Sequence, residues 1–234
     1  MDLNDIERHV KDWRLAVLGG SKVRSIGMPK RMAMGPAEIE MVREAIAAYQ
    51  VEGVDPGYQG VYEKRYTDAF VDFLGGGYAD AVSTGSASVF IALAALGLPK
   101  GSEVIVSPIT DPGTLSAIVM SGLKPRLADS RPMDYNVGLE QVRARLTSDV
   151  SAVCIVHSAG QATEIDAIVD VAREAGIKVV EDCSQSHGAT WKGRQIGTFG
   201  DIAAFSTMYR KSHITGGSGG VVFSRDLDLY RMAL

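Results

Sequence analysis

Residues 153–181 read VCIVHSAGQATEIDAIVDVAREAGIKVVE, and this stretch decides the fold. It begins with a strand-like run, 153–157, whose first four residues are continuously apolar, as is typical of a strand buried on both faces of a sheet. It ends with a second short run, 178–181, which also reads as a strand. Between them, residues 165–175 carry apolar side chains at helical spacing. The stretch therefore predicts a strand, a covering helix and a second strand parallel to the first.

The same alternation extends to both sides of this stretch. We expect further strands over residues 79–83, 103–107, 125–129, 202–206 and 220–223, and further helices over 87–98, 114–121 and 139–146. This order predicts an α/β fold in which a mainly parallel, seven-stranded sheet lies between helices. Ligands of such sheets bind at the carboxyl ends of the strands, so the polar residues found there are candidates for chemistry.

The first 60 residues lack this alternation. They contain one amphipathic helix, expected over 36–49, and a loop over 53–60. Another helix is expected over 61–74, ahead of the first strand. We therefore divide the chain into an N-terminal arm with a helix, residues 1–60, and a large domain, residues 61–234.

Composition argues against several classes of protein. The formal net charge is -4 and lysine and arginine are scattered, which argues against a nucleic-acid partner. The longest mostly apolar run, residues 87–98, is far shorter than the ~20 residues of a membrane span, and the acidic start does not resemble a secretory signal. Cys154 and Cys183 do not have the spacing of a zinc site or a disulfide framework. We expect a cytoplasmic protein without a metal site or a membrane partner.

The segment Ser83-Thr84-Gly85-Ser86-Ala87-Ser88 lies between a predicted strand and a predicted helix. Gly85 allows a tight turn, and Ser86 and Ala87 offer N–H groups at the start of the helix, where anions bind. A plain helix cap is the alternative, because serine is a common capping residue.

The strand over 178–181 runs into Asp182-Cys183-Ser184-Gln185-Ser186-His187-Gly188. An acid at the end of a buried strand needs a cation or a hydrogen-bond donor. A protonated pyridine nitrogen meets that need, and the carboxylate keeps the nitrogen protonated. The alternative is that Asp182 caps the turn that follows.

The strand over 202–206 delivers Ser206 and, five residues later, Lys211, ahead of the glycine-rich segment 216–220. A deprotonated lysine amine attacks carbonyl groups. A surface lysine and a simple glycine hairpin are the alternatives. Taken together, however, the three segments supply an anion site, a carboxylate and an amine at strand ends, which is the set that a pyridoxal 5′-phosphate (PLP) site requires.

These segments, in this order, resemble the DegT/DnrJ/EryC1/StrS family, which comprises PLP-dependent sugar aminotransferases of fold type I. The resemblance covers nearly the whole chain, and the block from Glu181 to Gly188 with a lysine downstream is its most specific part. The matching stretches are Leu18–Gly20, Ser83–Ala87, Gly101–Val106, Val156–Gln161, Glu181–Ala189, Gly197–Asp201, and Phe205-Ser206 with Lys211.

The resemblance implies a role for each candidate residue. Lys211 would hold PLP as a Schiff base and move a proton between substrate and cofactor. Asp182 would bind the pyridine nitrogen, and Gln185 the phenolic oxygen. The phosphate would be held by Gly85, Ser86 and Ser206.

The resemblance also implies a reaction. An amino group, with glutamate as the expected donor, would pass to a keto sugar, expected to be linked to a nucleotide. Such reactions serve the biosynthesis of cell-surface polysaccharides or of secondary-metabolite sugars. A homodimer is implied as well.

The chain departs from the family pattern at several points. The aromatic residue that usually covers the PLP ring falls on Asp111, so either Ile109 or Pro112 covers the ring or the substrate differs. The segment after Lys211 is one residue longer than usual, and Ser218 stands where a glutamate is common. Family enzymes also continue into a small C-terminal domain. We expect that domain to be absent here, which would make the chain a fragment, a truncated product or half of a split enzyme.

Two other functions stay open. PLP-dependent sugar dehydratases of the same family carry a histidine in place of the lysine, and a shifted alignment would bring His213 to that position. The count of five residues from Ser206 favours Lys211. A non-catalytic fragment is the other alternative, because family active sites borrow residues from a partner subunit and from the missing part.

Overall fold

The computed structural model describes residues 15–28, 30 and 32–234. The chain divides into two units, Met1–Glu40 and Met41–Leu234. The described part of the first unit contains a short 3-10 helix, η1 (Ala16–Leu18), and the start of α2 (Pro36–Glu52). The second unit contains every other element. The division into an N-terminal arm, residues 1–60, and a large domain, residues 61–234, stays a prediction.

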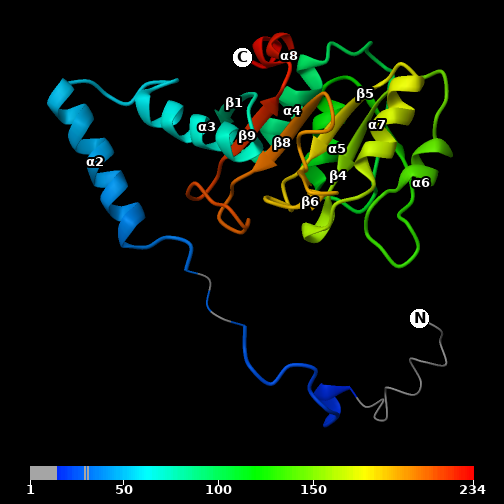
Figure 1. The fold of residues 1–234 in the computed structure, drawn as a ribbon, viewed down its shortest axis with the longest axis horizontal. Coiled ribbons are helices and arrows are strands. Elements are labelled where there is room, and N and C mark those ends of the chain that lie inside the picture. The colour runs from blue at the N-terminus through cyan, green and yellow to red at the C-terminus, as the bar shows by residue number, and fades with distance from the viewer. Residues whose placement is uncertain (1–14, 29, 31) are drawn as a thin grey trace. The chain divides into compact units, whose positions relative to one another are not determined.

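The second unit alternates helices and strands along the chain (Figure 1). Its helices are α3 (Val61–Leu74), α4 (Gly85–Ala95), α5 (Pro112–Met120), α6 (Leu139–Arg143), η2 (Ser158–Gly160), α7 (Ile165–Glu174) and α8 (Leu227–Ala233). Its strands are β1 (Tyr78–Val82), β2 (Glu103–Val106), β3 (Lys124–Leu127), β4 (Val150–Val156), β5 (Lys178–Asp182), β6 (Thr190–Trp191), β7 (Arg194–Gln195), β8 (Ile202–Ser206) and β9 (Gly220–Ser224).

Seven of the strands form one sheet in the order β1-β9-β8-β5-β4-β2-β3. The strands β3, β2, β4, β5 and β8 are parallel neighbours, while β9 runs antiparallel to both β8 and β1. The carboxyl ends of all strands except β9 therefore meet at one edge of the sheet. The mainly parallel, seven-stranded sheet that the sequence predicts is confirmed.

Alternate residues of the strands pack against different helices, because successive side chains in a strand point to opposite faces. Val104 and Val106 pack in one core cluster with residues of α4 and α5. Ile105, between them, packs in another cluster with residues of α6 and α7. Further along the second face, a third cluster joins β8 and β9 to α3. The sheet thus lies between α4 and α5 on one side and α7 on the other (Figure 1).

Element boundaries differ from the sequence-based ones for local reasons. Helix α4 begins at Gly85, two residues earlier than expected, because Thr84 caps it and accepts the N–H of Ala87 at 2.9 Å. Helix α6 ends at Arg143, earlier than expected, because the next turns are closed by tighter i→i−3 bonds. The β6–β7 hairpin and α8 come in addition to the predicted elements. Within the described residues, none of the helices combines the length and apolar character that crossing a bilayer requires.

Candidate functional site

A cavity of about 260 Å³ lies at the carboxyl edge of the sheet. Its walls come from the loops that follow β1, β2, β5 and β8, so segments far apart in the sequence meet there. All the site residues predicted from the sequence line it: Gly85, Ser86, Asp182, Gln185, Ser206 and Lys211. The cavity therefore brings an amine, a carboxylate and the start of a helix into one space.

The N-terminus of α4 forms one wall of this cavity. The N–H groups of Ala87 and Ser88 bond to the side chain and the carbonyl of Thr84. Those of Gly85 and Ser86 have no acceptor in the described part of the chain, so they are left for an anion. Gly85 must be glycine, because a methyl group there would lie 2.3 Å from Cβ of Ser206.

Asp182 forms the floor of the cavity at the end of β5. Its side chain is buried, with 3% of the residue exposed, yet protein donors satisfy each oxygen only once. Thr114 donates its hydroxyl to Oδ2 at 2.8 Å, and the N–H of Ser184 donates to Oδ1 at 3.1 Å. The turn-capping bond from Ser184, an alternative considered from the sequence, is present. It leaves lone pairs on both oxygens for a further donor.

Lys211 lies in the loop that joins β8 to its antiparallel neighbour β9. The loop is closed at its base by Thr207, which donates its N–H to the carbonyl of Gly219 at 2.9 Å. Higher up, the hydroxyls of Thr207 and Thr215 are 2.6 Å apart. Lys211 donates its own N–H to the carbonyl of Met208 at 2.9 Å. These bonds hold the loop so that its lysine lines the cavity.

His213 takes part in a different cavity. Together with Tyr66, Phe70, His187 and Ser212 it lines a second cavity of about 440 Å³. Its ring stacks on Tyr66 with centroids 5.8 Å apart, and its Nε2 is 3.0 Å from the Tyr66 hydroxyl. Lys211, and not His213, shares a cavity with Asp182, in agreement with the count from Ser206.

The histidines of this second cavity are held neutral by their surroundings. Burial, with smaller contributions from His213 and Lys211, lowers the pKa of His187 from 6.5 to about 4. Burial also lowers the pKa of His213. Neutral rings beside Lys211 add no positive charge to the loop that carries it.

Gln185 and Asp111 complete the rim of the first cavity. The Gln185 side-chain oxygen accepts the N–H of Ala159 at 3.1 Å, so its amide group keeps two N–H donors. Asp111, which the resemblance places at the ring-covering position of the family, caps α5 and lines the cavity. Ile109 and Pro112, the sequence-based candidates for covering a ring, are not among the lining residues of the described chain.

Glu181, the residue before Asp182, points to the opposite face of the sheet because successive side chains of a strand alternate, and it is fully buried. His157 donates to its Oε2 at 3.1 Å, and the N–H groups of Gly197, Phe199 and Gly200 each donate at 2.7 Å. Burial by itself raises the pKa of Glu181, but the bond and charge of His157 and the backbone donors outweigh it, so the net pKa lies below 4.5.

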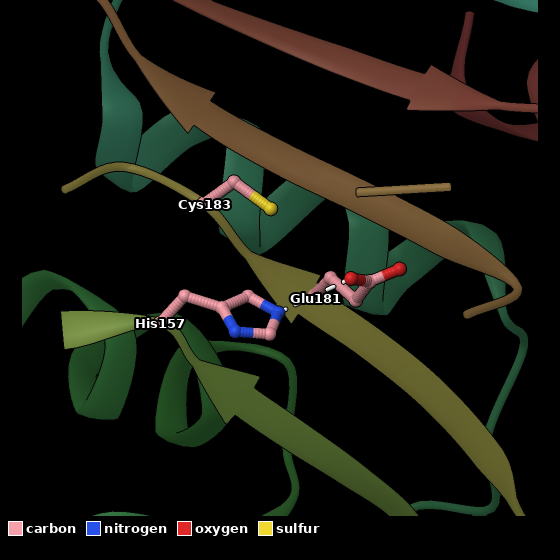
Figure 2. Close-up of side chains that lie close together, drawn as sticks. All are labelled: His157, Glu181 and Cys183. Atoms are coloured by element: carbon pink, nitrogen blue, oxygen red, sulfur yellow. Dashed lines mark hydrogen bonds and ion pairs between the residues drawn. The ribbon is translucent and has the colours of Figure 1, made fainter. Parts of the chain in front are cut away.

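Cys183 lies next to this pair, and the ligand-type atoms of His157, Glu181 and Cys183 are within 4.8 Å of one another (Figure 2). A metal ion there would have to displace N–H donors from Glu181. Burial, with Glu181 and Asp182 nearby, also raises the pKa of the Cys183 thiol well above 9.0, which disfavours the thiolate that binds metals. We interpret the cluster as a hydrogen-bonded anchor for the loop before β8.

Two functional candidates, Thr110 and Thr114, do not appear among the sequence-based predictions. Their hydroxyls are 3.0 Å apart, and Thr114 donates to Asp182. The two threonines thus form a short chain of hydroxyl groups that orients the Asp182 carboxylate. The four-residue spacing of the two threonines near the start of a predicted helix indicates that their side chains lie close together. The sequence does not show that this helix packs next to Asp182.

The fold and this cavity define a class of protein, the PLP enzymes of fold type I. The family model that describes the DegT/DnrJ/EryC1/StrS aminotransferase family matches residues 36–234. The chain belongs to this family.

The curated relatives of this chain include aminotransferases that are named for different substrates or products. The L-glutamine:scyllo-inosose aminotransferase of Streptomyces griseus is 31% identical over 220 residues, which make up 93% of this chain and 51% of the relative. GDP-perosamine synthase of Escherichia coli O157:H7 is 34% identical over 176 residues, or 75% of this chain and 48% of the relative. The chain spans about half the length of these curated relatives.

Solved structures agree with this assignment. An aminotransferase from Psychrobacter cryohalolentis matches with a TM-score of 0.77 at 32% identity, covering 83% of this chain and 49% of that one. The E. coli GDP-4-keto-6-deoxy-D-mannose-3-dehydratase, solved with bound hydrated PLP, matches with a TM-score of 0.79 at 25% identity, covering 86% and 52%. Proteins named for two reactions therefore share this fold.

Proposed function

We propose that the chain is the cofactor-binding part of a PLP-dependent aminotransferase that acts on a keto sugar or a related polyol ketone. The observation that carries the proposal is the meeting of Lys211, Asp182 and the N-terminus of α4 in one cavity. Membership of the aminotransferase family supports it. The expected donor is glutamate, or glutamine, which one relative carries in its name.

The cavity fits PLP group by group. Gly85 and Ser86 leave two N–H donors at a helix N-terminus for the phosphate, and Ser206, packed against Gly85, would add a hydroxyl. Asp182 would bind the ring nitrogen with its free lone pairs, and the Gln185 amide would donate to the phenolic oxygen. When bound, the cofactor supplies an electron sink for bonds broken at the substrate carbon.

The protein's own groups would do the remaining work. The Lys211 amine would link to the cofactor aldehyde and later carry a proton at its Nζ atom. Thr114 and Thr110 would keep the Asp182 carboxylate aimed at the ring nitrogen. The position of His213 in the second cavity, stacked on Tyr66, favours an aminotransferase over the dehydratase alternative. Nucleotide linkage of the sugar, a homodimer and a role in polysaccharide or secondary-metabolite sugar biosynthesis belong to the same proposal.

The lysine is tested by trapping. The chain is mixed with PLP and reduced with borohydride, and the modified residue is identified by peptide mass. Lys211 should carry the adduct, and Lys211→Ala should lose both the adduct and the visible absorption band. Lys192→Ala is the matched control, because Lys192 is an exposed lysine outside the cavity that pairs with Asp166. Labelling of another lysine, or of none, would show that the proposal is wrong.

The reaction class is tested next, on the wild-type chain loaded with PLP. L-glutamate or L-glutamine alone should convert the aldehyde form of the cofactor to its amine form, seen as a blue shift of absorption. A dehydratase would need its sugar substrate before any turnover. A chain that captures PLP on Lys211 but shows no shift with either donor would contradict the aminotransferase proposal and leave the dehydratase and the non-catalytic fragment as alternatives.

A further inference from the structure

Asp111 is fixed beside the helix start that we assign to the phosphate. It caps α5, and its Oδ1 accepts the N–H of Gly113 at 2.8 Å. A methyl group on Gly113 would lie 3.0 Å from that Oδ1 and 2.2 Å from Oγ of Ser86. The Asp111 carboxylate and the Ser86 hydroxyl therefore flank the same glycine, next to the N-terminus of α4.

The cavity contains few charged groups to balance this carboxylate. Its titratable lining residues are Asp111, Asp182 and Lys211. Asp182 is assigned to the ring nitrogen and Lys211 to the carbon that carries the cofactor's aldehyde or amine, so neither is assigned to the phosphate near Ser86. The Oδ2 atom of Asp111 has no hydrogen-bond or ion-pair partner within the described chain.

A carboxylate at this position opposes the binding of a phosphate. The N-terminus of a helix attracts anions through its free N–H groups and the helix dipole. Asp111 places a negative charge on the other side of Gly113 from Ser86, and this charge repels an anion bound at the start of α4. Asp111 is exposed, so solvent screens the repulsion but does not remove it.

We propose, on the basis of the proposed function, that the carboxylate of Asp111 weakens the binding of the cofactor phosphate at the N-terminus of α4. Retention of the cofactor then depends mainly on the covalent link to Lys211. The form of the cofactor that carries an amine, and has no such link, leaves the cavity readily. An aromatic residue at this position would have no such effect.

The competing explanation is that Asp111 only caps α5. Asparagine caps helices about as well as aspartate does, so Asp111→Asn keeps the cap and removes the charge. Asp226 provides the matched control. It caps α8 in the same manner, accepting the N–H groups of Asp228 and Leu229, and it does not line the cavity.

The probes are pyridoxamine 5′-phosphate and pyridoxamine, which differ only in the phosphate. Neither has an aldehyde, so their binding does not involve the link to Lys211. The dissociation constants are measured by calorimetry for wild type, Asp111→Asn and Asp226→Asn. We expect Asp111→Asn to bind the phosphorylated probe roughly threefold to tenfold more tightly, with no change for pyridoxamine, as for a screened charge a few ångströms away. Asp226→Asn should match wild type.

Three results would overturn the inference. One is an unchanged or weaker affinity of Asp111→Asn for the phosphorylated probe. Another is an equal gain for both probes, which would place the effect on the ring rather than on the phosphate. The third is a failure of all three proteins to bind the phosphorylated probe. Trapping of PLP on Lys211 in the wild-type chain separates these results from failure of the proposed function, because that reaction does not depend on Asp111.

Discussion

Glu181 and Asp182 are adjacent in β5 and almost equally buried, yet their surroundings differ. Glu181 receives four protein hydrogen bonds, three of them from backbone N–H groups of the loop before β8. Asp182 receives two and borders a cavity. Burial alone therefore does not separate the two acids. They differ in the number of lone pairs that the protein leaves free, and this difference supports the proposal that Asp182 binds the cofactor.

The largest expected effect comes from removing the saturated acid. Glu181→Ala leaves His157 and three backbone N–H groups without their acceptor inside the core. We expect a loss of about 3–5 kcal/mol in the free energy of unfolding, the usual effect of removing one partner of a buried charged network. Urea unfolding of both proteins measures it. A loss no larger than that of Asp182→Asn would break the comparison.

Asp182, the acid that we propose to bind the cofactor, should show the opposite pattern. Asp182→Asn keeps the shape of the side chain and removes its charge, so stability should change little. The affinity for PLP should fall about tenfold to a hundredfold, because a hydrogen bond to a charged group contributes about 1.5–3 kcal/mol. Titration of PLP absorbance measures it. Thr114→Val, which removes a donor but not the charge, should cause a smaller loss; an equal or larger loss would contradict the order.

The smallest expected effect is in the pH dependence of stability. His187 has a folded pKa of about 4, below its ordinary 6.5, so the unfolded chain takes up its proton first as pH falls. Its contribution is present above pH 6.5 and is lost between 6.5 and about 4. Glu181, whose folded pKa is lowered, loses its contribution only below pH 4.5.

Unfolding free energies at pH 7.5 and pH 5 test this separation. The wild type should lose about 1–2 kcal/mol over this range through His187. His187→Gln should lose less, since it has no proton to gain. Identical losses in the two proteins would show that the acid sensitivity lies elsewhere.

Local patterns in the sequence were sufficient for the seven strands of the main sheet and for helices α2 to α7, because strands and helices differ in the period of their apolar residues. They did not predict the β6–β7 hairpin or α8. They also located Gly85, Asp182 and Lys211, because each follows a strand whose carboxyl end must lie at the same edge. The different roles of Glu181 and Asp182 were less accessible. The donors to Glu181 come from His157 and from the turn at 197–200, and the pairing depends on how three segments pack.

Thr114 and Asp111 illustrate the same limit. The sequence places both near the start of a helix, and a cap and a small polar residue are ordinary there. Only the packing of α5 against α4 brings Thr114 to Asp182 and Asp111 to Ser86. These positions depend on contacts between elements that are distant in sequence, and the local spacing of apolar residues does not predict such contacts.

The pairing of β8 with β9 has a consequence for tolerance of insertions. Ser206 lies opposite Gly220, so the register of the sheet closes the lysine loop at its base, whatever the length of the chain between them. A residue added after Lys211 lengthens the loop at little entropic cost, and the pairing of Ser206 with Gly220 stays unchanged. The length of the segment after Lys211 is therefore less constrained than the spacing from Ser206 to Lys211.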